Sequence, residues 1–256
     1  MKKFLNSLFA FLLIFGIIAA FGFASDAMLS FSDKTVSLNE SVKSDYDEAA
    51  KVEGEVYYVY DQIAVQEVTR TRYGIETGTQ ETYFYLIESY NKDWYTDMES
   101  DYEPLTLVYA TGDKDKAAKL DEMVEAWYDF EEKYMEWAYD ENASEDDYPK
   151  EPSLTFDISG VITEAPDAKV IDYRDDYIAD CLTDDVEEYI DQYCVDMIIQ
   201  DKDLGSSRII FFAGIAGAVV GLIGLIAMFI GSRKAKKAMM ADQAESVQEN
   251  NIDNIQ

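Results

Sequence analysis

The feature that most constrains this chain is the run Ile209–Ile230, which holds no charged and no amide side chain. A helix of this length can cross the roughly 30 Å hydrocarbon layer of a bilayer. The residues just after the run include four cations: Arg233, Lys234, Lys236 and Lys237. Because cationic residues beside a span favour the cytoplasmic side, we predict a transmembrane helix over 209–230 and a cytoplasmic tail over 231–256. This tail is either disordered or a frayed continuation of the helix. The same cations favour contact with anionic membrane lipid.

A second apolar segment occupies residues 1–24, where Lys2 and Lys3 precede an uninterrupted apolar run. Two interpretations compete: a secretory signal peptide cleaved before Ser25, or an uncleaved transmembrane anchor. The run is slightly long for a signal peptide, which favours the anchor. Either interpretation keeps the N-terminal cations in the cytoplasm. The sequence therefore predicts a cell-membrane protein with residues 25–208 extracytoplasmic and the C-terminus cytoplasmic.

Small residues recur at every fourth position of the predicted second span, at Ala213, Gly217 and Gly221. Residues four apart share a helix face, and small side chains allow another helix to approach closely. This face is a candidate for association of two copies into a homo-oligomer, or for a seat for the first span. The spacing alone does not choose between the two.

The segment between the two apolar runs is strongly acidic. The chain has 52 Asp and Glu against 21 Lys and Arg, a net charge of −31, and all but four of the acids lie within 25–208. Such a field repels phosphate backbones, so nucleic acid is excluded as a partner, whereas cations and basic partners are attracted. Acids alternate with apolar residues and aromatics reach 14%, which indicates a folded domain and not a disordered segment.

The outer segment divides into a linker over 25–50, with a short strand around Thr35–Leu38, and a folded domain over 51–204. Apolar residues at helical spacing predict a long helix after Asp113, capped by that residue, and a helical stretch over 167–203 broken near 182–184. Period-two alternation and apolar runs predict five strands, namely Val52–Tyr60, Ile63–Tyr73 with a bulge between Val65 and Val68, Thr82–Ile87, Leu105–Ala110 and Leu154–Ile162. We therefore expect an α+β fold: an antiparallel sheet of about five strands with two or three helices on one face, flanked by two transmembrane helices.

Catalytic chemistry is scarce in this sequence. The chain has no histidine, which excludes His-based triads and most zinc sites. It also lacks a phosphate-binding glycine loop and a nucleotide fingerprint. We therefore predict no cofactor and nominate no catalytic residue. Cys181 and Cys194 are expected to be reduced thiols, with an intermolecular disulfide as the alternative. Thirteen residues of continuous helix would hold them about 20 Å apart, beyond the reach of an intramolecular disulfide, and a break near Thr183 would still leave Cys194 several turns along.

An acidic loop resembles a calcium-binding loop in its spacing. Its potential oxygen ligands are Asp140, Asn142, Ser144, Asp146 and Glu151. Glu145 stands where such a loop needs the glycine of its sharp turn, and a strand follows the loop in place of a helix. These departures favour a solvated acidic loop over a metal site.

Two further pairs are candidate ligand-binding residues. Arg70 and Arg72 lie two apart on a predicted strand, so both guanidinium groups project from the same face of an otherwise acidic domain. They either pair with neighbouring acids or bind an anionic ligand. Trp94 and Tyr95 lie in a predicted loop, where aromatic rings can stack on a sugar or a peptide.

The order of elements carries a resemblance. An N-terminal anchor precedes three short strand motifs, interleaved with helices, and a final span; the motifs are Val52-x-Gly54-x-Val56, Tyr83-x-Tyr85-Leu86-Ile87 and Ile158-x-Gly160-Val161. This layout resembles small two-span envelope proteins of uncharacterised function from Gram-positive bacteria. The resemblance implies a location in the bacterial envelope and no particular activity.

A complete folding pattern without catalytic motifs favours a membrane-anchored extracytoplasmic binding or scaffolding protein, with an envelope or extracellular partner. One alternative is a membrane sensor, in which the helix expected before Ile209 couples the outer domain to the second span. The other is a carboxylate-dependent hydrolase of envelope glycans, since two carboxyl groups flanking a cleft suffice for that chemistry.

Overall fold

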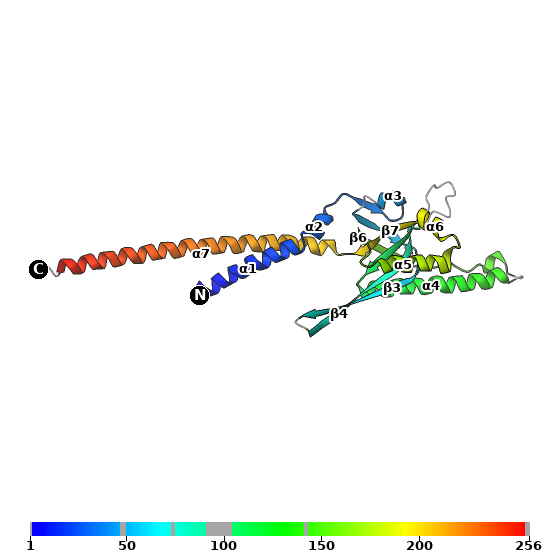
Figure 1. The fold of residues 1–256 in the computed structure, drawn as a ribbon, viewed down its shortest axis with the longest axis horizontal. Coiled ribbons are helices and arrows are strands. Elements are labelled where there is room, and N and C mark those ends of the chain that lie inside the picture. Colours follow the sequence, from blue (N-terminus) through cyan, green and yellow to red (C-terminus); the bar gives the residue numbers. More distant parts are fainter. Residues whose placement is uncertain (1, 47–49, 73–74, 91–103, 141–142, 254–256) are drawn as a thin grey trace. The chain divides into compact units, whose positions relative to one another are not determined.

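The computed structural model describes residues 2–46, 50–72, 75–90, 104–140 and 143–253 (Figure 1). These form two compact units. One comprises Met1–Phe31 and Leu204–Gln256, and the other comprises Ser32–Asp203.

The first unit consists of α1 (Lys2–Gly22), α2 (Ala24–Ser30) and α7 (Leu204–Asp253). Two helical segments, Phe4–Gly22 and Leu204–Met240, are long and apolar enough to cross a membrane, with mean hydropathies of 2.4 and 2.7. The α7 helix continues to Asp253, as in the second of the two alternatives for the tail. The tail is rich in Ala, Gln and Lys, which favour helix, and it continues a helix already nucleated in the span.

Glycines of α7 lie directly against α1. A Cβ atom added to Gly221 would lie 2.6 Å from the Leu13 backbone nitrogen, and one added to Gly214 would lie 2.7 Å from that of Ala20. The order of these contacts makes the two helices antiparallel, as Figure 1 shows. This packing is that of a seat for the first helix, one of the two roles predicted for the small residues, whereas association of two copies stays a prediction. Ala213, which was assigned to this face, is instead exposed.

The second unit is built on one seven-stranded sheet with the order β1-β2-β6-β7-β5-β4-β3. The β1/β2 and β5/β7 pairs are parallel and the other four are antiparallel. The strands are β1 (Thr35–Ser37), β2 (Lys51–Val56), β3 (Tyr58–Arg72), β4 (Ile75–Glu88), β5 (Thr106–Thr111), β6 (Phe156–Thr163) and β7 (Cys194–Asp201). The mixed α and β composition was predicted, but the sheet has two more strands than expected and is not purely antiparallel.

Helices pack on both faces of this sheet, whereas the sequence predicted one face. Side chains of β4 alternate between two cores. Tyr85 and Ile87 join the core under α4 (Lys114–Tyr139), and Phe84 and Leu86 join the core under α5 (Ala168–Tyr177). Because β4 is covered on both faces, its sequence is a continuous apolar run. Such a run does not indicate on which face of the sheet the helices pack.

Residues 186–201 differ most from the predicted secondary structure. The apolar stripe predicted one helix here, but α6 (Val186–Tyr193) ends at Tyr193 and the central strand β7 starts at Cys194. Val195 and Ile199 face one core and Ile198 faces the other. A strand buried on both faces has no period-two alternation, so its apolar run was mistaken for more of the helix.

Smaller corrections concern the N-terminal half of this unit. The strand predicted over Val52–Tyr60 is two strands that meet at Tyr57. The β3–β4 pairing shifts register at three places, but none lies between Val65 and Val68, where a bulge was expected. The expected linker over 25–50 contains α2, β1 and α3 (Lys43–Tyr46) and contributes the buried side chains of Leu38 and Tyr46.

The helix predicted after Asp113 is confirmed as α4. The Asp113 carboxylate accepts the backbone N–H of Asp115 at 2.9 Å and that of Lys116 at 3.3 Å, which satisfies two of the amides left unpaired at a helix start. Two short turns complete the described chain, η1 (Glu145–Asp147) and η2 (Ile178–Leu182).

Candidate aromatic binding cleft

A cleft of about 600 Å³ opens in the second unit between α4, the β2–β3 junction and the segment before β6. Aromatic rings from four separate parts of the chain line it: Tyr57, Tyr90, Trp127 and Tyr148. The segment 149–153 also lines it, including Pro149 and Pro152. Its volume falls within the usual range for small-ligand sites.

Trp127 is held in the lining of the cleft by a hydrogen bond. Its indole N–H donates to the backbone carbonyl of Tyr57 at 3.0 Å, which ties α4 to the junction between β2 and β3. Tyr57 and Tyr90 meet edge to face, with ring centroids 6.1 Å apart. The Tyr57 hydroxyl donates to the Glu55 carboxylate. These contacts hold the rings in place before any ligand arrives, which reduces the entropy lost on binding.

Tyr148 is held by an aromatic cluster on the last turns of α4. Tyr148 meets Trp137 edge to face at 5.1 Å between centroids and also contacts Phe130 and Tyr134. The Trp137 indole N–H donates to the Ser144 carbonyl at 2.9 Å. These contacts hold Ser144 and Tyr148 against the helix, and Tyr148 is one of the residues that line the cleft.

The cleft lies in an acidic setting. Lys150 and Glu151 both line it, and the Glu55 carboxylate is bonded to the Tyr57 hydroxyl at its edge. Asp146 and Asp147 are exposed just before Tyr148. Aromatic faces attract cations, and surrounding carboxylates strengthen that attraction. The arrangement is suited to a ligand that carries positive charge on an apolar or planar frame.

A cluster of polar side chains lies where β4 ends. Glu88 pairs with Tyr58 on β3 and with Thr106 on β5 in the strand register. Burial raises the pKa of Glu88 to about 7, although a hydrogen bond from Tyr60 opposes the shift. Burial and the Glu88 charge also raise the pKa of Tyr60 far above its usual range. The Tyr189 hydroxyl continues the network to Thr106 Oγ1 at 2.9 Å.

The candidate anion site falls largely outside what the structure describes. Arg70 and Arg72 lie near the end of β3, where their backbones pair with Gly78 and Ile75. Their side chains are not among the described residues, and neither are Trp94 and Tyr95. These four assignments stay predictions.

The calcium-like loop is organised by hydrogen bonds of its own. Asp140 caps the end of α4, and Asn142 lies outside the described residues. The Ser144 hydroxyl donates to the Asp147 carboxylate at 2.7 Å and the Ser144 N–H at 3.2 Å, and these bonds lower the pKa of Asp147. Asp146 and Glu151 are exposed. Among the described residues, no group of three or more Cys, Asp and Glu is placed to hold a metal ion.

Sequence reasoning did not nominate the four rings of the cleft. The sequence placed Trp127 in the long helix after Asp113, Tyr57 in the strand Val52–Tyr60, and Tyr148 in the acidic loop. Because the rings come from distant parts of the chain, no local spacing relates them. The one available signal was the pair Pro149 and Pro152 directly after Tyr148, which marks a stiff, extended segment.

Comparisons with known proteins gave no match to a family model, to a curated protein or to a solved structure. The resemblance to two-span envelope proteins therefore stays a prediction, and the function is argued from the site alone.

Proposed function

We propose that this chain is a membrane-anchored binding protein whose outer domain holds a basic, extended segment of a partner in the aromatic cleft. The observation that carries the proposal is the gathering of Tyr57, Tyr90, Trp127 and Tyr148 around one cleft in a strongly acidic part of the chain.

Three physical effects support this ligand class. The ring faces and the two prolines offer apolar contact area, which favours a ligand with an apolar or planar frame. The rings also attract guanidinium and ammonium groups, by about 1–2 kcal/mol where the pair is shielded from water. The surplus of carboxylates on the domain raises the local concentration of cationic partners and repels anionic ones.

The membrane placement rests on the helix pair of the first unit. Antiparallel packing of α1 and α7 through Gly214 and Gly221 supports a topology in which the chain's two ends lie on one side of a bilayer and residues 32–203 lie on the other. Lys2, Lys3 and the cations of 233–237 favour the cytoplasm for the side that holds the ends. Binding would then occur at the cell surface or in the envelope.

The test uses the full chain reconstituted in lipid nanodiscs and fluorescent peptides of equal length with the repeats Arg–Pro, Gln–Pro and Glu–Pro. Proline keeps all three extended, so the peptides differ in charge alone. We expect the Arg–Pro peptide to bind, with an affinity that falls as salt is raised. Equal binding of the Gln–Pro peptide, or preference for Glu–Pro, would refute the ligand class.

A matched pair of variants assigns the binding to the cleft. Tyr148 and Tyr173 are 46% and 48% exposed, but Tyr173 lies on α5, away from the cleft. Loss of the Tyr148 ring by Tyr148→Ala is expected to weaken Arg–Pro binding on the order of tenfold, whereas Tyr173→Ala should leave it unchanged. Equal effects of the two substitutions would show that the cleft is not the site. The membrane sensor and the glycan hydrolase stay predictions from the sequence.

A further inference from the structure

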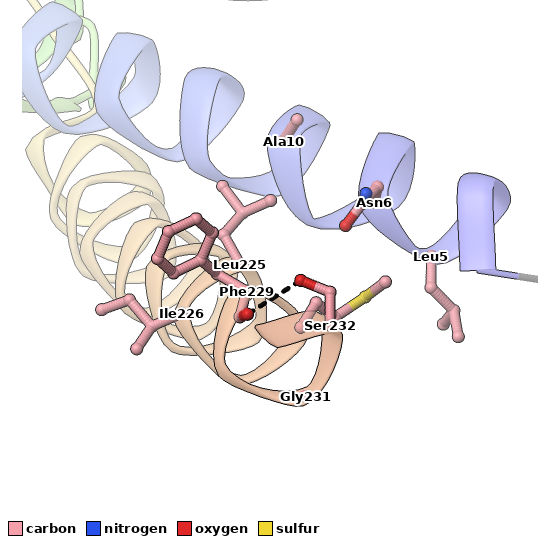
Figure 2. Close-up of a pocket in the computed structure, with 9 residues that line it drawn as sticks. Leu5, Asn6, Ala10, Leu225, Ile226, Phe229, Gly231 and Ser232 are labelled. Atoms are coloured by element: carbon pink, nitrogen blue, oxygen red, sulfur yellow. Dashed lines mark hydrogen bonds between the residues drawn. The ribbon is translucent and has the colours of Figure 1, made fainter. Parts of the chain in front are cut away.

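A second large groove lies between the two helices of the first unit, toward the end where the chain begins. It has a volume of about 930 Å³ and is lined by α1 and α7 (Figure 2). Its walls are mostly apolar, with Leu5 and Ala10 on α1 and Leu225, Ile226 and Phe229 on α7, and α1 also contributes the polar side chain of Asn6.

The groove exists because the close packing of the two helices ends. Gly214 and Gly221 hold the helices in backbone contact, and at Gly224 the Phe9 ring already fills the place of a Cβ. Beyond this point α7 carries Leu225 and Phe229, which cannot sit in a backbone-to-backbone contact. The helices therefore separate, and a space open to the surroundings is left between them.

Hydrocarbon must fill such a space inside a bilayer, because water gains no hydrogen bonds from apolar walls. At the end of the groove, however, the chain turns polar. Ser232 lines it, and the Arg233 guanidinium lies over the Phe229 ring at 4.4 Å from the centroid. Arg233 is thereby held beside a residue that forms the wall. Lys234, Lys236 and Lys237 follow.

We propose that this groove binds an anionic phospholipid of the cytoplasmic leaflet, with an acyl chain between α1 and α7 and the headgroup phosphate on Arg233. The inference rests on the membrane insertion proposed above but not on the aromatic cleft. Charge complementarity selects the occupant: an apolar slot that opens onto a cluster of cations matches an acyl chain ending in a phosphate. A helix from a second copy would bring the same cations with it and would meet repulsion there.

The experiment is native mass spectrometry of the full chain released from nanodiscs containing equal amounts of phosphatidylglycerol and phosphatidylcholine. We expect one phosphatidylglycerol to be retained preferentially. Arg233→Gln should reduce this retention about fivefold, the effect of one cation near an anionic surface. Arg208→Gln is the matched control, because Arg208 lies in the first turns of α7, before the apolar run, and its guanidinium also lies over a ring, that of Phe31.

A variant that fills the groove distinguishes lipid bound within the groove from lipid attracted by the nearby cations alone. Ala10→Phe keeps every cation but places a ring in the groove, so retention should fall although the charge is unchanged. Equal retention of the two lipids, an equal effect of Arg208→Gln, unchanged retention in Ala10→Phe, or a dimer without lipid would each overturn the proposal. Failure of the chain to enter nanodiscs would instead refute the membrane insertion on which the inference rests.

Discussion

The stability of the second unit should depend on pH through one half-buried carboxyl group, that of Glu88. This residue ends β4, between Tyr58 and Thr106 of the neighbouring strands. Burial raises its pKa to about 7 from an ordinary value of 4.5. The protonated form is therefore favoured in the folded state. Its contribution to stability is fully present below about pH 4.5 and is lost as the pH rises through 7.

The size of the effect follows from the shift. A difference of about 2.5 pKa units corresponds to about 3 kcal/mol between the two ends of the range, and residual contact of Glu88 with solvent makes this an upper bound. Glu88→Gln keeps the shape of the side chain and accepts the Tyr60 hydrogen bond without ionising. We expect the variant to match the wild type at pH 4.5 and to exceed it by up to about 3 kcal/mol at pH 8.

The assay is urea unfolding followed by tryptophan fluorescence in detergent micelles. All three tryptophans lie within residues 94–137, so the signal reports on the second unit and not on the helices of the first unit. Glu53→Gln, at an exposed position on β2, is the control and should leave the pH dependence unchanged. A constant difference between Glu88→Gln and the wild type across pH 4.5 to 8 would refute the reasoning.

Three further predictions follow from single contacts. Trp127→Phe removes the hydrogen bond from the indole to the Tyr57 carbonyl and should lower the free energy of unfolding by about 1 kcal/mol in the same urea assay. An unchanged urea midpoint would contradict a stabilising role for this bond. Asp113→Ala removes the cap of α4 and should also cost about 1 kcal/mol, seen as a lower urea midpoint with the same slope. Gly221→Leu should force α1 and α7 apart and abolish fluorescence energy transfer between dyes on the two helices, whereas Gly231→Leu, where a Cβ meets nothing within 4 Å, should not; equal transfer in both variants would contradict the packing.

The sequence predicted those elements whose pattern is set locally. Ile209–Ile230 and the N-terminal run needed only their length and apolar composition. The α4 helix was predicted with its first residues because Asp113 is a capping residue and an apolar stripe follows it. Such features depend on residues within a few turns of one another.

Features set by distant partners were not predictable in this way. The strand β7 was missed because both of its faces are buried, which removes the alternation that identifies a strand. Its parallel pairing with β5 depends on a long crossover that no local pattern encodes. The same limit applies to the cleft, where Tyr57, Tyr90, Trp127 and Tyr148 are brought together only by the folded chain.

The central claim is that the second unit lies outside the cell between two membrane helices, and the two native cysteines allow a direct test. Cys181 is exposed, whereas Cys194 is buried and its pKa is raised to about 11 by burial, so Cys194 should not react. A membrane-impermeant maleimide applied to intact cells that express the chain is expected to add one label per molecule and none to Cys181→Ser. If the chain is labelled only after the cells are lysed, the second unit is cytoplasmic and the account is wrong.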